Sequence, residues 1–213
     1  MKKVDFHVHT NFSDGLLSPK DVVKRASNNG VSILAITDHD TIDGISEAIE
    51  ESKLHNIKII PGIELSTNYN GESIHVLGYF KDDSYKENEF VEFLDKIKNR
   101  RIHRAKEMIQ KLKDIFNIEI KFEDVIKYGE NVVARPHIAK AIIDAGYPYT
   151  QDYIFDNFIG KGKPAYIETT KITVKEGVDL LHKYNAIVFL AHPILINNSN
   201  ISDFLQFNFD GIE

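Results

Sequence analysis

The stretch VDFHVHTNFSDG at residues 4–15 sets a pattern that the rest of the chain repeats. Residues 4–8 are a short β-branched run, which predicts a strand, and polar side chains follow it. Side chains two residues apart on an extended chain point to the same face, so we expect His7 and His9 to point the same way. Two imidazoles on one face can share a metal ion. One such pair is weak evidence by itself, so the later strands decide the interpretation.

Short apolar runs and helix-like stretches alternate outside residues 83–160. The expected strands are residues 4–8, 31–36, 58–63, 73–80, 165–168, 186–191 and 210–213. Helices are expected after Ser18, an N-cap, after Thr173, which opens a capping box, and over residues 43–55. The dipeptide Asn-Gly at residues 70–71 predicts a hairpin. This alternation predicts an α/β fold with a mainly parallel sheet, whose seven strands nearly close a barrel.

Residues 83–160 interrupt the pattern with a mostly helical and more charged segment. Apolar side chains recur there at helical spacing and are interpreted as core contacts. They are Phe90, Phe93, Leu94, Ile97, Ala105, Met108, Ile109 and Leu112. We therefore expect a barrel domain over residues 1–82 and 161–213, incomplete at its C-terminus, and an inserted helical cap domain over residues 83–160.

Composition excludes several classes of protein. The 213 residues carry 26 Lys and Arg against 32 Asp and Glu, a net charge of −6, so we expect no stable nucleic-acid partner. The absence of cysteine excludes disulfide scaffolds, thiolate zinc fingers and thiol nucleophiles. No apolar run approaches the roughly 18 residues that span a bilayer, and the first residues turn polar too soon for a signal peptide. We expect a cytoplasmic protein without a membrane partner.

Histidines and carboxylates lie at the other predicted strands as well. Asp14 follows the first strand, His39 the second, Glu64 the third and His192 the sixth, while His75 lies within the fourth. Active sites of barrels form at the C-terminal ends of strands, so these side chains are predicted to converge. Imidazole and carboxylate ligands without thiolate suit Zn, Mn or Fe ions. The set exceeds what one four-coordinate ion takes, and a central carboxylate such as Glu64 is placed to bridge two ions.

The remaining polar residues near these motifs have simpler interpretations. His55 and His182 lie on helices and are interpreted as solvated or packed side chains. Residues 100–104, which contain one more histidine, are interpreted as a solvated helix face. Asp38 and Asp40 flank the histidine after the second strand. Either one of them orients that imidazole, or both cap the following turn, and the sequence leaves the two alternatives open.

Two further features indicate an anionic substrate. Residues 134–138 begin a helix with Pro136 expected at its first position, and a helix N-terminus offers free N–H groups to an anion. Arg135 adds a guanidinium that can bind phosphate through two hydrogen bonds. The loop 160–164 adds positive charge, including that of Lys163. Beside a metal site, these features favour phosphate binding.

Taken together, these motifs resemble the PHP (polymerase and histidinol phosphatase) family of metal-dependent phosphoesterases. The motifs that carry the resemblance are residues 5–10, 13–15, 37–40, 61–64, His75 and 191–193. Residues 134–137 and 162–164 are similar to the subgroup that acts on nucleoside bisphosphates and short oligonucleotides. The resemblance implies a distorted (βα)₇ TIM-like barrel with a helical insertion and two or three divalent ions.

The resemblance also implies roles for single residues. His7, His9 and Glu64 would hold one ion, Glu64, His75 and His192 a second, and Asp14 and His39 would contribute to a third. Glu64, His9, Arg135 and His137 would be the catalytic residues, and Arg135, His137 and Lys163 would bind the substrate phosphate.

One family motif is not found in this sequence. A Ser-Asp-x-His segment after the last strand of the family completes the first and third metal sites. Here residues 202–205 are Ser-Asp-Phe-Leu, without the histidine, and they precede the last predicted strand. Asp203 is therefore not expected to be a ligand, and the chain is expected to end before that segment. Only the second site is expected to keep its full set of protein ligands.

The expected activity is hydrolysis of a phosphomonoester, either of a nucleoside 3′,5′-bisphosphate or at the 5′ end of a short oligonucleotide. Histidinol phosphate is an alternative substrate. An amidohydrolase also uses a His-x-His motif at its first barrel strand, although Arg135 and Lys163 favour a phosphorylated substrate. A non-catalytic module that binds metal or nucleotide, or an inactive fragment, is a third alternative and predicts no turnover.

Overall fold

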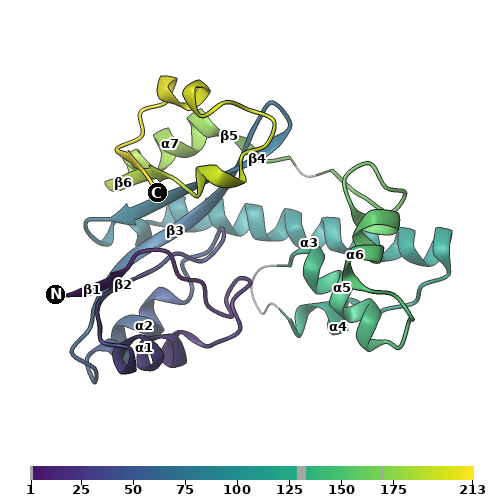
Figure 1. Cartoon of the computed structure of the whole chain (residues 1–213), viewed down its shortest axis with the longest axis horizontal. Helices are drawn as coiled ribbons and strands as arrows, with labels where there is room; N and C mark the ends of the chain where they lie inside the picture. The colour runs from purple at the N-terminus through teal and green to yellow at the C-terminus, as the bar shows by residue number, and fades with distance from the viewer. Residues whose placement is uncertain (1, 129–132, 169) are drawn as a thin grey trace. The chain divides into compact units, whose positions relative to one another are not determined.

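In the computed structural model, which describes residues 2–128, 133–168 and 170–213, one long strand organises the sheet (Figure 1). This strand, β3 (Lys58–Tyr69), pairs with β2 along its first residues and with β4 along the remainder. The sheet has seven strands in the order β1-β2-β3-β4-β6-β7, and β5 pairs with β3. The other strands are β1 (Lys3–Asp5), β2 (Val31–Ile36), β4 (Glu72–Phe80), β5 (Ile172–Thr173), β6 (Ala186–Leu190) and β7 (Gly211–Ile212).

Helices lie between the strands in the chain. They are α1 (Pro19–Asn28), α2 (Ile45–Ser52), α3 (Asn88–Phe116), α4 (Phe122–Ile126), α5 (Arg135–Asp144), α6 (Gln151–Ile154) and α7 (Val174–Lys183). Short 3₁₀ helices cover Asp83–Lys86, Pro193–Leu195 and Ile201–Gln206, and a π-helical turn covers Phe155–Ile159. Among the described residues, no helix has both the length and the apolar character that crossing a bilayer requires.

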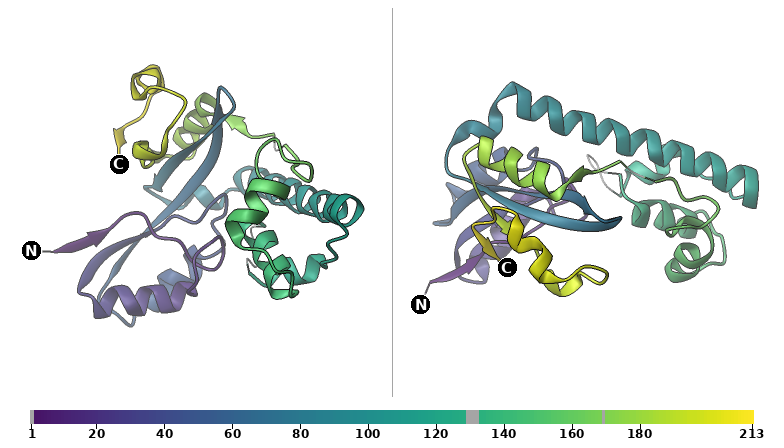
Figure 2. Two further views of the ribbon diagram at one scale, coloured as in Figure 1. Left: turned by 45° about the vertical axis from the view of Figure 1, so that its right-hand side comes forward. Right: turned by 90° about the horizontal axis from the view of Figure 1, so that it is seen from above.

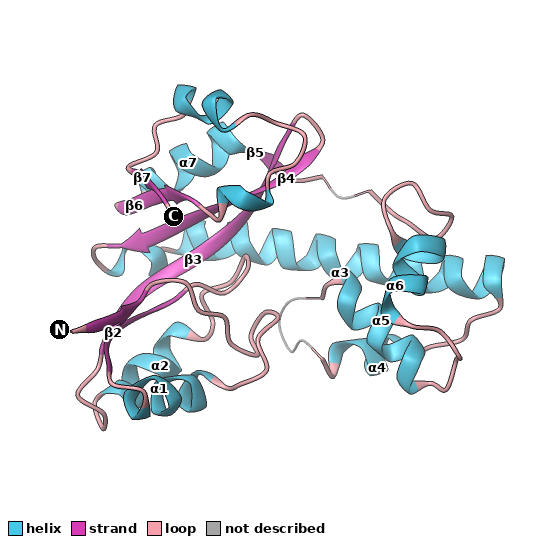
Figure 3. Ribbon diagram, viewed as in Figure 1, coloured by secondary structure: helices cyan, strands magenta, loops and turns pink. Residues whose placement is uncertain are grey.

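The chain divides into two compact units, Met1–Leu94 with Lys171–Glu213 and Asp95–Thr170. Helix α3 begins in the first unit and continues into the second. All described strands belong to the first unit, whereas α4, α5 and α6 belong to the second (Figure 3). The predicted barrel and cap domains, with boundaries after residues 82 and 160, stay a prediction.

The sheet is mainly parallel, as predicted, and among the described strands β4 alone runs against the others. The β1–β2, β2–β3, β3–β5 and β6–β7 pairs are parallel, whereas β3–β4 and β4–β6 are antiparallel. The cause is the predicted Asn-Gly hairpin. Asn70 and Gly71 have φ values of 50° and 81°, the left-handed conformations that a tight hairpin turn requires, and β4 folds straight back on β3.

The sheet of the first unit curls into a half-barrel (Figure 2). Strands β1 and β7 are its two edges, yet His7, just after β1, and Glu213, just after β7, lie 2.9 Å apart between Nδ1 and Oε1. Helix α1 packs on β2, α2 on β3, and α7 on β3, β4 and β6. The fold is therefore a mixed α/β fold in which the polar segments after the two edge strands, β1 and β7, contact each other.

Local signals explain where several elements begin. Ser18 caps α1 by accepting a hydrogen bond from the Asp21 backbone N–H, as predicted. Thr173 and Glu176 form the predicted capping box of α7. The predicted strand over residues 165–168 is wrong, because the Ala165 and Tyr166 N–H groups donate to carbonyls of preceding residues and not to a neighbouring strand. Ala165, for example, donates to the Phe158 carbonyl.

The second unit has its own apolar core. Ala105, Met108 and Leu112 of α3 are buried in it, which confirms that stripe as a core contact. Ala165 and residues of α5 and α6 complete the packing. In the first unit, Phe90 of α3 is fully buried against the Tyr184 ring, with 4.6 Å between the ring centroids.

We predict that Thr173→Ala lowers the free energy of unfolding by about 1 kcal/mol, because the Glu176 backbone N–H loses its side-chain acceptor. Chemical denaturation followed by circular dichroism measures the change. Thr173→Ser keeps the hydroxyl and serves as the matched control. An alanine variant as stable as the serine variant would show that the cap contributes nothing.

Candidate metal centre

Glu64 lies at the centre of a polar cluster in the first unit. Its side chain is 1% exposed, and imidazole nitrogens surround both carboxylate oxygens. Oε1 lies 2.7 Å from His192 Nε2 and 2.8 Å from His75 Nδ1, and Oε2 lies 3.0 Å from His9 Nε2, 3.1 Å from His7 Nε2 and 3.1 Å from His39 Nδ1. The structure therefore brings together six of the seven predicted metal ligands around one carboxylate.

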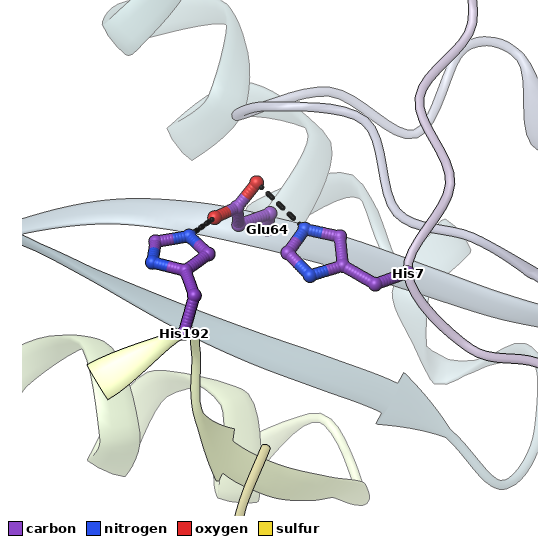
Figure 4. A group of neighbouring side chains, drawn as sticks. All are labelled: His7, Glu64 and His192. Carbon is purple, nitrogen blue, oxygen red and sulfur yellow. Dashed lines mark hydrogen bonds and ion pairs between the residues drawn. The ribbon is translucent and has the colours of Figure 1, made fainter. Parts of the chain in front are cut away.

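The five imidazoles form a closed circle around Glu64. The centroid distances around it are 5.1 Å for His7–His9, 4.6 Å for His9–His39, 4.8 Å for His39–His75, 5.3 Å for His75–His192 and 5.6 Å for His192–His7. Figure 4 shows His7 and His192 on opposite sides of the Glu64 carboxylate. We call these six residues the histidine cluster.

Sheet register places the strand-borne members of the cluster. Glu64 on β3 and His75 on β4 are diagonal neighbours, because His75 pairs with Ser66, two residues beyond Glu64. His39 continues the path of β2 and forms an isolated parallel bridge with Glu64. His192 follows β6, whose last residue pairs with β4. Neighbouring strands thus deliver these side chains to one point.

His7 and His9 come from the segment after β1. Both reach Glu64, and their Nε2 atoms lie 3.1 Å apart, so the two side chains point the same way. The Thr37 backbone N–H donates to the Val8 carbonyl and holds this segment beside the end of β2. The predicted alternation of side chains therefore continues past the end of β1, into the segment that carries both histidines.

Asp38 anchors the loop that carries Asp14. The Thr10 backbone N–H and hydroxyl and the Ser13 hydroxyl all donate to its carboxylate. Burial raises the Asp38 pKa, and these hydrogen bonds oppose that rise. Asp38 thus supports the neighbouring loop. Asp40, at φ 53°, accepts a hydrogen bond from the Ser66 backbone N–H on β3.

Asp14 lies at the rim of the histidine cluster. Its carboxylate oxygens lie 3.5 Å from His9 Nδ1 and 3.6 Å from His39 Nε2, and the side chain is 47% exposed. These nitrogens are the ones that point away from Glu64. The structure therefore places Asp14 where it adds a carboxylate to the outer side of two cluster histidines.

The histidines and Glu64 shift one another's protonation. Burial raises the pKa of Glu64, but hydrogen bonds from His7, His75 and His9 outweigh it and hold that pKa far below its usual range. Burial lowers the pKa of His7, but hydrogen bonds to Glu64 and Glu213 raise it to about 9. Burial lowers the pKa of His39 to about 4, and the Glu64 charge opposes this shift. Glu64 is therefore ionised.

The donor set fits divalent metal ions. Two groups of side chains have ligand atoms within 4.8 Å of one another, His7 with Glu64 and His192, and His9 with His39 and Glu64. His39 Nδ1 is buried and makes no hydrogen bond to any described residue, although Glu64 lies beside it. A cation between such nitrogens and a carboxylate gives each lone pair a partner, and Zn, Mn and Fe accept these ligands. The assignment of ions to ligand sets stays a prediction.

The predicted phosphate ligands belong to the second unit. Helix α5 begins at Arg135, with Pro136 at its second position, one residue later than predicted. His137 is buried, and its Nδ1 accepts a hydrogen bond from the Ala134 N–H, which leaves the proton of the neutral ring on Nε2. Lys163 is exposed on the turn that follows Gly160.

Arg104 departs from the interpretation of residues 100–104 as a solvated face. His103 is 77% exposed, as expected, but Arg104 Nε donates to the Ile167 carbonyl at 2.7 Å. The guanidinium carbons of Arg104 and Arg135 lie 5.4 and 5.6 Å from the Tyr166 ring centroid. Burial and the Arg135 charge lower the Arg104 pKa. Arg104 directly precedes Ala105, the first residue of the buried α3 stripe, and this position was the signal in the sequence for its partial burial.

Glu213 was also missed as a functional candidate. From the sequence, Glu213 is expected only to be part of the last strand. Its carboxylate accepts hydrogen bonds from His7 Nδ1 and from the His192 backbone N–H. The available signal was its place, since it follows a strand as the predicted ligands do.

Known proteins resemble this chain over most of its length. The PHP domain profile matches residues 5–185. A 5′–3′ exoribonuclease of Haemophilus influenzae is 33% identical over 218 residues, which cover 100% of this chain and 78% of that protein. A 3′,5′-nucleoside bisphosphate phosphatase of Chromobacterium violaceum is 27% identical over 195 residues, which cover 91% of this chain and 67% of that protein.

A solved structure supports the fold. An amidohydrolase from Chromobacterium violaceum, with bound sulfate and no metal, matches with a TM-score of 0.84 and 26% identity. The match covers 99% of this chain and 75% of that one.

We predict that Glu64→Gln weakens binding of Zn²⁺ by more than about 100-fold, because the carboxylate shared by the five histidines is lost. Isothermal titration calorimetry measures the affinity. His55→Gln is the control, since His55 pairs with Glu51 of α2, away from the histidine cluster. Unchanged binding by the Glu64 variant would contradict a metal centre at Glu64.

In the metal-free protein, His7 is expected to titrate near pH 9. Because its pKa is raised from 6.5 to about 9, the stability that protonated His7 contributes is fully present below pH 6.5 and is lost as the pH rises through 9. NMR titration with a His7→Gln variant for assignment measures the midpoint. Saturating Zn²⁺ should remove this titration, since a metal ligand must be deprotonated. A midpoint below 7 would contradict the electrostatic description.

Proposed function

The chain belongs to the PHP domain family of metal-dependent phosphoesterases, and we propose that it hydrolyses a phosphomonoester of a nucleoside 3′,5′-bisphosphate or at the 5′ end of a short oligonucleotide. The observation that carries this proposal is the histidine cluster around ionised Glu64. The proposal extends to the fold, a distorted (βα)₇ TIM-like barrel with a helical insertion.

The proposed metal ligands are those of the histidine cluster together with Asp14. His7, His9 and Glu64 would hold one ion, Glu64, His75 and His192 a second, and Asp14 and His39 would contribute to a third. When bound, such ions lower the pKa of a water molecule and offset the charge of a transferring phosphoryl group. Glu64 keeps its negative charge over the physiological pH range and thus supplies an anionic ligand throughout.

The second unit offers groups that recognise phosphate. Arg135 and Arg104 flank the Tyr166 ring, and neither forms an ion pair with a carboxylate of a described residue. Two neighbouring guanidiniums without a carboxylate attract an anion, and Arg135 can bind phosphate through two hydrogen bonds. The Ala134 N–H fixes the His137 ring, and Lys163 adds an exposed positive charge. We propose that Arg135, His137 and Lys163 bind a substrate phosphate.

The similar proteins support the substrate class. The two curated relatives are named an exoribonuclease and a nucleoside bisphosphate phosphatase, and both names describe cleavage of a phosphate ester of a nucleotide. A solved relative is named an amidohydrolase, so amide cleavage is a useful comparison reaction. Histidinol phosphate is the alternative phosphomonoester. It carries one phosphate and no nucleobase, so it depends less on Arg135.

We predict that the protein with Mn²⁺ releases phosphate from a nucleoside 3′,5′-bisphosphate, and that His9→Ala lowers the rate at least about 100-fold, because stabilisation by bound ions is lost. Arg135→Lys should raise KM by about 10-fold for the bisphosphate, since one of two charged hydrogen bonds is lost. A colorimetric phosphate assay measures both effects.

His55→Ala is the matched control, and histidinol phosphate and an amide are the comparison substrates. Release from histidinol phosphate alone, unaffected by Arg135→Lys, would reassign the substrate. Metal binding without release from any substrate would support the non-catalytic module instead.

A further inference from the structure

Glu213 touches the histidine cluster from the far edge of the sheet. It follows β7, which pairs in parallel with β6, and its backbone N–H donates to the Leu190 carbonyl at 3.0 Å. The carboxylate, 37% exposed, lies between two cluster histidines that come from different strands. The residue therefore occupies a place where the two edges of the half-barrel meet.

The first contact involves the His7 ring. Glu213 Oε1 and Oε2 lie 2.9 and 3.1 Å from Nδ1 of His7, while Nε2 of the same ring lies 3.1 Å from Glu64 Oε2. A carboxylate accepts hydrogen bonds, so Nδ1 carries a proton. Nε2 hydrogen-bonds to Glu64 in the metal-free protein, and when the Nε2 proton is lost, Nε2 is the nitrogen whose lone pair is free to bind a cation beside Glu64. Partners of this kind set the tautomer and the orientation of a metal-binding imidazole.

The second contact involves the backbone of His192. This residue has φ 26° and ψ 65° and precedes Pro193, a backbone conformation that a non-glycine residue rarely adopts. Such a conformation is strained and persists only when neighbouring groups hold it. The His192 N–H donates to Glu213 Oε2 at 2.8 Å, and its carbonyl accepts from the Leu195 N–H at 2.9 Å.

We propose that Glu213 is a positioning residue of the metal centre, which fixes His7 in its Nδ1–H form and holds the strained backbone of His192 so that both rings present Nε2 to Glu64. The inference rests on the proposed function for its biological meaning. It predicts metal affinity and a ring proton, however, and both are measured without substrate. The two proposals can therefore fail separately.

Glu72 provides a matched control. Its buried carboxylate accepts hydrogen bonds from the Asn197 and Asn198 N–H groups and from the Ser199 hydroxyl. It therefore anchors the loop that follows His192, as Glu213 does, but it acts farther along the chain. A purely structural effect of loop anchoring should appear in Glu72→Ala as well, whereas an effect through the His7 ring should not.

The test compares Glu213→Ala, Glu213→Gln and Glu72→Ala. We expect Glu213→Ala to weaken Zn²⁺ binding about 10- to 100-fold. We expect Glu213→Gln to lose less, because its amide oxygen still accepts hydrogen bonds, and Glu72→Ala to bind as the unaltered protein does. Competition with a chromophoric chelator measures these affinities. Equal affinity of Glu213→Ala and the unaltered protein, or an equal loss in Glu72→Ala, would overturn the proposal.

A metal-free measurement separates this inference from the proposed function. Long-range ¹⁵N–¹H spectra of protein labelled in histidine should show a His7 Nδ1–H protected from solvent exchange, present in Glu72→Ala and absent in Glu213→Ala. An exchange rate of that proton unchanged by Glu213→Ala would refute the role of Glu213 whatever the activity. If the proton behaves as expected and no phosphate is released, only the proposed function fails.

Discussion

The structure depends on one buried carboxylate. An ionised Glu64 inside the protein is unfavourable unless charged or hydrogen-bonding partners compensate for its loss of water. Five imidazoles provide these partners here. Two of them come from the segment after β1, and the other three come from β4 and from the segments after β2 and β6. Such a polar group in the interior makes no sense as packing alone, because apolar side chains would fill the same space at lower cost. Its chemistry is that of a cation site.

Carboxylates also hold the loops around the histidine cluster. Four of them accept a backbone N–H from a segment at the site. They are Asp38 with Thr10, Asp40 with Ser66, Glu72 with Asn197 and Glu213 with His192. A hydrogen bond to a backbone N–H fixes the path of the loop without depending on the loop's side chains. The ligands are therefore positioned by a second layer of acidic residues, which the rigid strands of the sheet carry or border.

The second unit uses charge in the opposite sense. Arg104 and Arg135 face the same Tyr166 ring, and each repels the other because both are always protonated. The aromatic ring and the Ile167 carbonyl offset part of this repulsion. An anion would offset the remainder. The cationic pair of the second unit thus suits an anion, such as the proposed substrate phosphate.

The sequence by itself determined the local structure and the chemical type of the site. Ser18, Thr173 and the Asn-Gly turn act within a few residues, so their helix starts and hairpin were predictable. The sequence also predicted the residue types of the candidate metal centre and their positions in or just after the strands. Only the tertiary structure decided the curl of the sheet that brings its edges together, the half-buried Arg104 and the contacts of Glu213. His192 and Glu64 are 128 residues apart in the chain, and His7 and Glu213 are 206 apart. Periodicity reports only the near neighbours of a residue, whereas these contacts arise from the curl and register of the whole sheet.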